Sequence, residues 1–135
     1  METAKTKYIG DMRTEMVHVR SGSVIVTDAP VDNQGKGEYF SPTDLVAAAL
    51  GSCAFTIMGI AAREHKFLID GSTCSITKIM TDAPRKIGEV RIEFEFPANN
   101  YTDKQKKILE HCAKTCPVAL SLNESVFQNV TLKFK

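Results

Sequence analysis

The stretch Ser41-Pro-Thr-Asp-Leu-Val-Ala-Ala-Ala-Leu-Gly-Ser-Cys53 decides how this chain folds, because it begins a long apolar helix. Ser41 has the side chain of an N-cap, Pro42 suits the first helical position, and Asp44 follows three residues after the cap. The pattern predicts a helix from this cap to about His65.

The helix interior, from Leu45 to Ala62, carries no charge and approaches the length of a membrane span. Much of it is Ala, Gly, Ser, Thr and Cys, and charged residues stand against both ends, so a buried central helix fits better. Gly51 and Gly59 lower its helical propensity, so packing must hold it. A helix that is apolar almost all round must be covered on every side, and one small sheet covers only one. We therefore expect an obligate homodimer.

Strand and helix patterns flank this helix. Expected strands cover residues 7–20, 23–28, 73–81, 87–96 and 126–134, with a loop over residues 29–40. Residues 87–96 alternate apolar and charged side chains, so one face should be buried. Thr102-Asp-Lys-Gln105 is a capping box that opens a helix to about Lys114, and Pro117 opens a short one to about Asn123. The order predicts an α+β fold, residues 1–135 as a single domain, with antiparallel sheets packed around the long helix.

Composition narrows the function classes. The chain has 135 residues, 43% hydrophobic, and a formal net charge of +1 with both signs interspersed. Nothing in this balance requires nucleic acid or an anionic membrane as partner. The N-terminus shows no apolar segment of a secretory signal, so we expect a cytoplasmic protein. Four cysteines in a reducing compartment are typical of catalytic, metal-binding or core thiols rather than structural disulfides.

Two of the four cysteines stand in helical contexts. Cys53 is mid-helix on the face of Ala49, Ile57 and Ile60, where an inert core thiol is the plain alternative to a reactive one. Cys116 precedes a proline at a helix start, where free backbone N–H groups and the helix dipole favour a thiolate.

The other thiols have simpler interpretations. Cys112 lies one helical turn before Cys116, but a zinc site would need two more ligands and only His111 is near. Cys74 lies in a strand and reads as a core residue. Arg13, taken alone, reads as a strand residue that faces water, and the three histidines reach no triad spacing.

Taken together, two separated cysteine motifs resemble the OsmC/Ohr family of thiol-dependent hydroperoxide reductases. They are the opening stretch with Thr56 after it, and Cys116-Pro-Val-Ala-Leu-Ser-Leu122. The hairpin Tyr8-Ile-Gly-Asp-Met-Arg13 and the segment 28–37 match as well, so the resemblance covers nearly the whole chain. It implies small α+β chains that form intertwined homodimers.

The resemblance also implies roles for individual residues. Cys53 would be the peroxidatic cysteine and Cys116 the resolving one, with Arg13, or alternatively Arg20, stabilising the thiolate. Family members with established peroxidase activity resemble Asn-Pro-Glu at the start of the long helix, with the glutamate orienting the arginine. This chain has Thr43 at that position, and Asp44 is turned away from it by about 100°.

The chemistry implied needs no metal, flavin or nucleotide. The thiolate of Cys53 would reduce a small organic hydroperoxide and become a sulfenic acid, Cys116 would form a disulfide with it, and an external dithiol such as a lipoyl protein would recycle the enzyme. Apolar walls at Leu50, Phe55 and Ile57 would suit an organic peroxide. Two alternatives stay open, namely a redox-responsive or ligand-binding dimer with little turnover, and a structural dimer with core thiols.

Overall fold

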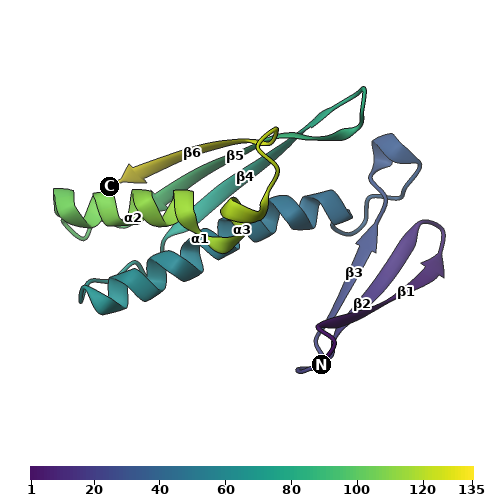
Figure 1. Ribbon diagram of the computed structural model, residues 1–135, viewed down its shortest axis with the longest axis horizontal. Coiled ribbons are helices and arrows are strands. Elements are labelled where there is room, and N and C mark those ends of the chain that lie inside the picture. Colours follow the sequence, from purple (N-terminus) through teal and green to yellow (C-terminus); the bar gives the residue numbers. More distant parts are fainter. The chain divides into compact units, whose positions relative to one another are not determined.

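The computed structural model describes all residues, 1–135, and is shown in Figure 1. The chain forms two compact units, residues 1–46 and residues 47–135. The long helix α1, Pro42–Glu64, begins at the end of the first unit and continues into the second. The single domain expected from the sequence stays a prediction, and each unit is described by itself below.

The N-terminal unit contains a three-stranded antiparallel sheet in the order β1-β2-β3, followed by a short 3-10 helix, η1. Its elements are β1 Ala4–Gly10, β2 Arg13–His18, β3 Val24–Asp28 and η1 Val31–Asn33. The continuous strand predicted over residues 7–20 is wrong, because the chain turns at Gly10, Asp11 and Met12. Their φ angles are 101°, 53° and 60°, in the left-handed region that a strand does not use.

The start of α1 agrees with the sequence prediction. The Ser41 N–H donates to Asp44 Oδ2 at 3.0 Å, and the Asp44 N–H donates to Ser41 Oγ at 3.1 Å. This reciprocal pair satisfies two backbone donors that a helix start would otherwise leave open. The predicted cap and the observed first turn therefore coincide, and the helix ends within a residue of the predicted place.

The C-terminal unit contains a second three-stranded sheet, in the order β4-β5-β6. Its elements are β4 Thr73–Thr81, β5 Lys86–Phe96, α2 Asp103–Thr115, α3 Pro117–Ser121 and β6 Phe127–Phe134. The α+β class and the largely antiparallel pairing expected from the sequence are confirmed, with one correction: β4 and β5 are antiparallel, but β5 and β6 are parallel. The chain leaves β5, runs back through α2 and α3, and enters β6 in the direction of β5, because parallel neighbours need such a crossover.

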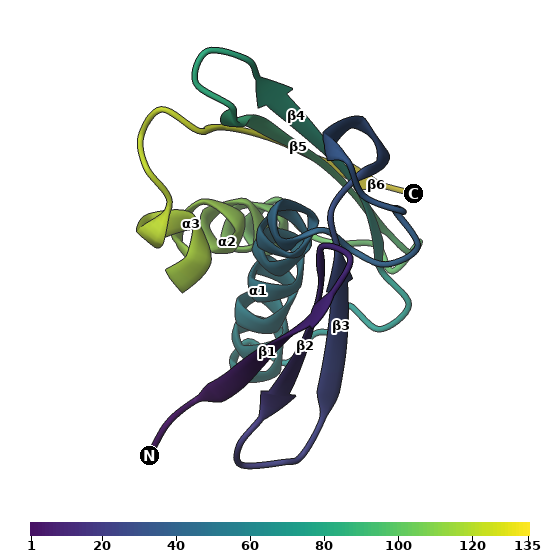
Figure 2. The same ribbon diagram turned by 90° about the vertical axis from the view of Figure 1, so that its right-hand side faces the viewer.

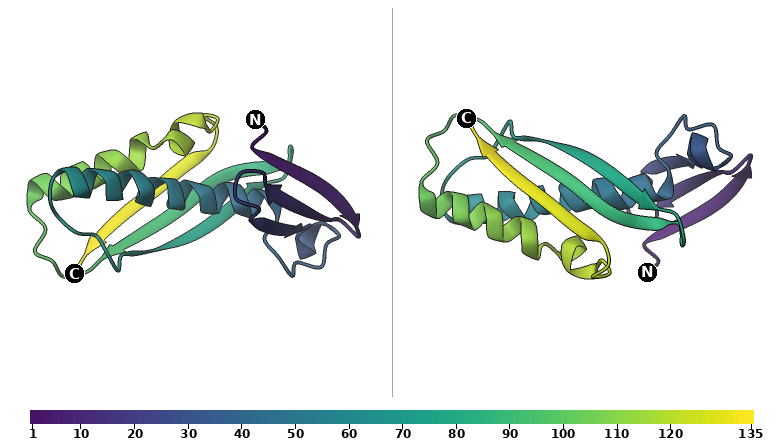
Figure 3. Two further views of the ribbon diagram at one scale, coloured as in Figure 1. Left: turned by 90° about the horizontal axis from the view of Figure 1, so that it is seen from below. Right: turned by 90° about the horizontal axis from the view of Figure 1, so that it is seen from above.

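The two long helices, α1 and α2, cover one face of this sheet, side by side, and leave its other face open (Figures 2 and 3). β5 alternates as predicted, with Val90, Ile92, Phe94 and Phe96 buried and the charged residues between them exposed. Phe94 is fully buried and meets Phe55 of α1 edge-on, with ring centroids 5.0 Å apart. This contact fixes the middle of α1 against the centre of the sheet.

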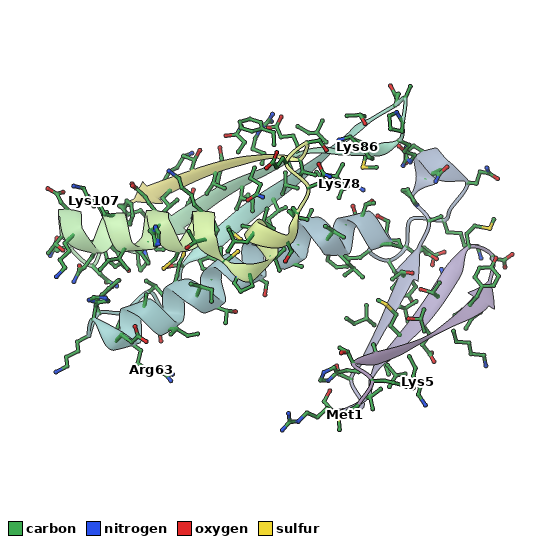
Figure 4. The ribbon with its side chains drawn as sticks, in the orientation of Figure 1. Met1, Lys5, Arg63, Lys78, Lys86 and Lys107 are labelled. Carbon is green, nitrogen blue, oxygen red and sulfur yellow. The ribbon has the colours of Figure 1, made fainter.

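α1 buries only one of its sides within the chain. The buried stripe consists of Ala47, Leu50, Gly51, Ala54, Met58 and Ala62. An 18-residue window of the helix has a mean hydropathy of 2.0, yet only 33% of it is buried. By length and composition such a helix could cross a membrane, a test that core helices of soluble proteins also pass. Ile60 is 52% exposed, and Arg63 points away from the sheet (Figure 4).

Candidate active site

The structure brings Cys53 and Cys116 together. Cys53 lies near the middle of α1 and is half-buried, whereas Cys116 is completely buried. The two thiols are neighbours, because the Cys53 side chain is one of the groups that raise the pKa of Cys116. Cys116 sits where two helices meet, since it is at once the C-cap of α2 and the N-cap of α3, with an extended backbone (φ −64°, ψ 151°). The following Pro117 occupies the first position of α3, where its missing N–H costs nothing.

The environment of Cys116 favours the neutral thiol. Its Sγ accepts a hydrogen bond from the Ala119 N–H at 3.4 Å, as an N-cap side chain does. Burial nevertheless raises the pKa of Cys116, and the hydrogen bond from Ala119 only partly offsets this effect. The expectation that a helix start favours the Cys116 thiolate is therefore wrong. Desolvation is the larger effect, and it follows from packing rather than from the local sequence.

The two remaining thiols lie apart from this pair. Cys112 is buried, and its Sγ lies 3.9 Å from the carbonyl oxygen of Ile57 in α1. Cys74, on β4, packs against α1 at Gly51, where its Sγ would be 3.3 Å from an added Cβ. Burial raises the pKa of both thiols. Both therefore behave as packed apolar side chains, and no group of three or more His, Cys, Asp or Glu side chains is placed to hold a metal ion.

Arg13 is held within the N-terminal unit by Asp28, its cross-strand partner in the sheet. Arg13 Nε donates to Asp28 Oδ1 at 2.8 Å, and Nη2 donates to Asp28 Oδ2 at 2.9 Å. The Tyr39 ring lies 4.8 Å below the guanidinium, and the Glu38 carboxylate lies 3.6 Å from Nη2. The strand arginine is thus paired rather than simply solvated, and the hydrogen bond between the two side chains lowers the pKa of Asp28 and raises that of Arg13.

Asp28 is the residue that sequence reasoning missed. It is 1% exposed, and its Oδ2 also accepts the Glu38 N–H at 3.1 Å. The sequence did contain a signal for it. Asp28 is an acidic residue at the end of a strand rich in β-branched residues, Val24–Asp28, and it pairs with the only arginine of β2. Arg20, the alternative arginine, lies exposed in the turn after β2.

Two other expectations concerned the surroundings of Cys53. Thr43, at the helix start, shares a hydrogen bond with the Ser41 hydroxyl at 3.2 Å. Leu50, expected to form an apolar wall, is 1% exposed and belongs to the core instead. Beyond Cys53, a cleft of about 640 Å³ runs along the second half of α1, from Phe55 past Ile60 to Asp70.

Comparison with known proteins places this arrangement in a family. The family described as OsmC-like protein matches residues 35–131. The chain belongs to the OsmC-like family. The family likeness read from the two cysteine motifs is therefore confirmed, and α1 is the core helix of an OsmC-like domain. No curated protein matches the sequence.

Solved structures agree with this assignment. A protein from Psychrobacter arcticus, assigned to osmotic stress induced and detoxification response, is 49% identical over 98% of this chain and 96% of its own, with a TM-score of 0.93. An OsmC-like protein from Mycoplasma pneumoniae (16% identity, 97% and 94% covered, TM-score 0.80) shares the fold. An organic hydroperoxide resistance protein, OsmC, from Legionella pneumophila also shares the fold (15% identity, 98% of each chain covered, TM-score 0.72).

Proposed function

We propose that this OsmC-like protein is a cysteine-based peroxidase that reduces organic hydroperoxides in the cytoplasm, as an antioxidant enzyme. One observation carries the proposal, namely two neighbouring thiols that differ in burial. The half-buried thiol of Cys53 can meet a peroxide, whereas Cys116, completely buried, can react only with what forms on Cys53. The difference in access gives each thiol its role.

In the first step, the Cys53 thiolate attacks the distal oxygen of the hydroperoxide. The S–O bond forms as the O–O bond breaks, and the departing alkoxide takes up a proton and leaves as the alcohol. The sulfur of Cys53 is oxidised to a sulfenic acid, and the peroxide is reduced. In this proposal Arg13 supports the thiolate as a hydrogen-bond donor.

In the second step, the Cys116 sulfur attacks the sulfenic sulfur. The S–S bond forms, the S–O bond breaks, and water leaves with the thiol proton. An external dithiol, such as a lipoyl protein, then reduces the disulfide through a mixed disulfide and is itself oxidised. The net reaction turns one hydroperoxide and one dithiol into an alcohol, water and one disulfide.

The test compares serine variants of the four cysteines. Cys53→Ser should abolish dithiol-dependent consumption of an organic hydroperoxide, because a hydroxyl is a far poorer nucleophile at neutral pH. Cys74→Ser and Cys112→Ser are matched controls, since these thiols pack elsewhere, and should keep at least half of the turnover. Full turnover in Cys53→Ser would refute the assignment, and selective loss in a folded control would mean that another pair reacts.

A second candidate is a redox-responsive or ligand-binding dimer with little turnover. Thr43 favours it, because the helix start carries no carboxylate at that position. Trapping of the Cys53 sulfenic acid with dimedone, without steady-state consumption of hydroperoxide, would identify this function. Turnover with a dithiol would identify the peroxidase.

The proposed assembly is a homodimer. α1 is apolar over 18 residues but only 33% buried, and a cleft of about 640 Å³ lies along its second half. An apolar face of this extent on a soluble chain marks an interaction surface. Sedimentation at low micromolar concentration should show a dimer that dissociates only on unfolding. A folded, stable monomer would contradict it.

A further inference from the structure

A groove of about 620 Å³ lies between α1 and α2, which run side by side in the C-terminal unit (Figure 3). Two of its lining residues, Ala61 and His65, come from the last turns of α1 and its end. The others come from α2, and they are Lys104, Lys107, Ile108, His111 and Cys112. The volume is in the range of sites that hold a small molecule.

The floor of this groove is apolar. Ala61 and Ile108 are half-buried, and Cys112 is buried, with its Sγ 3.9 Å from the carbonyl oxygen of Ile57. The lining residues of α2 recur at intervals of three and four, so they form one stripe along that helix. From Lys104 to Cys112, at 1.5 Å per residue, the stripe is about 12 Å long, roughly the length of an extended chain of ten carbons.

The rim of the groove is basic. Lys104 and Lys107 are exposed, and neither side chain takes part in an ion pair or a hydrogen bond within the chain. Lys107 projects from α2 in Figure 4. His65 and His111 add two imidazole rings, each of which can donate an N–H to an anion. No acidic residue lines the groove, although the chain as a whole has 17 basic and 16 acidic residues.

The groove is separate from the cleft along α1 that we assign to the dimer surface. The two share no lining residue. Ile60 lines the cleft and Ala61 lines the groove, and successive residues of a helix point about 100° apart. The proposed dimer surface therefore does not account for the groove.

We propose that this groove binds a free, unbranched carboxylic acid of medium chain length. Its alkyl chain lies on Ala61, Ile108 and Cys112, and its carboxylate meets the ammonium groups of Lys104 and Lys107. A purely apolar ligand would leave both charges without a partner, and a small anion would leave the floor in water. The inference concerns a site apart from the thiol pair, and it does not rest on the proposed function.

The experiment titrates the intact reduced protein with decanoate, followed by calorimetry. Two probes separate the parts of the ligand: butanoate has the same head group and a short chain, and decyltrimethylammonium has the same chain and the opposite charge. Decanoate should bind saturably with a Kd below about 1 mM, and both other probes at least tenfold more weakly. Absence of saturable decanoate binding, or equal binding of the cationic amphiphile, would overturn the inference.

A pair of double variants places the carboxylate. Lys104→Gln with Lys107→Gln should weaken decanoate binding at least fivefold. Lys106→Gln with Lys114→Gln is the matched control, because it removes the same charge from the same helix outside the groove, and it should change the affinity less than twofold. An equal loss in both double variants would reduce the effect to net charge and overturn the inference.

Methyl NMR places the alkyl chain. Saturating decanoate should shift the methyl signals of Ala61 and Ile108 and leave those of Ile60, in the separate cleft, unchanged. Shifts confined to Ile60 would place the ligand in the cleft and refute the site. Sedimentation of the Lys104→Gln, Lys107→Gln variant gives a further check: a changed oligomeric state with unchanged decanoate affinity would make the groove an interface between copies and would also overturn the inference.

Discussion

Oxidation by one equivalent of an organic hydroperoxide should join Cys53 to Cys116 within one subunit and stabilise the protein measurably. The two side chains are already close enough for Cys53 to raise the pKa of Cys116, so the link needs no large movement. It would close a loop of about 64 residues, for which the loss of unfolded-state entropy corresponds to about 4 kcal/mol at 25 °C. For a chain of this length, that is a rise in melting temperature on the order of 10 °C.

The assay combines non-reducing peptide mapping with thermal and urea unfolding of the reduced and oxidised forms. Both forms are compared at one protein concentration, because the stability of a dimer depends on it. The competing link, Cys112–Cys116, would close a loop of only about five residues and add about 2 kcal/mol. Mapping that finds this link, or only over-oxidised Cys53, would refute the two-cysteine cycle, and so would an oxidised form no more stable than the reduced one.

Three further predictions concern the packing that supports the site. Phe94→Ala should lower the free energy of unfolding by about 3–5 kcal/mol in urea denaturation, because it removes a fully buried ring that meets Phe55; a loss below about 1 kcal/mol would contradict this. Gly51→Ala should lower the melting temperature despite a helix-propensity gain of about 1 kcal/mol, because the new Cβ would lie 2.7 Å from Ile76 Cδ1; a rise would show that Ile76 moves aside freely. Burial raises the pKa of Cys116, so stability should be retained at neutral pH and fall as the pH rises above about 9, where the unfolded thiol ionises first; Cys116→Ala should show a smaller fall between pH 8 and pH 10.

Local sequence signals predicted the helix starts well. The capping pairs at Ser41 and Thr102 are both present, with the Gln105 N–H donating to Thr102 Oγ1 at 3.1 Å. Each of these motifs joins residues three apart in the sequence, so it forms from local contacts and does not depend on a distant partner. The alternation in β5 was equally informative, because one face of the strand packs against helices whatever the order of the strands.

Features that depend on distant partners could not be predicted in this way. The parallel pairing of β5 with β6 depends on the path of α2 and α3, and the Arg13–Asp28 pair depends on the register of two strands. The turn at residues 10–12 was missed because the residues on both sides of it have the pattern of a strand. The pairing of Cys53 with Cys116 came from the family resemblance, since no spacing rule joins residues so far apart, and the pKa of Cys116 is set by burial, which a helix start does not reveal.

The uneven burial of the two thiols also sets the direction of enzyme recycling. In the proposed disulfide, an incoming dithiol can reach the sulfur of Cys53 but not that of Cys116, which is completely buried. The mixed disulfide must therefore form on Cys53, and Cys116 must be the leaving group. A thiol with a raised pKa leaves more slowly. The same packing that shields the resolving sulfur from peroxide thus slows its release, so we expect reduction by the dithiol, rather than reaction with peroxide, to limit turnover.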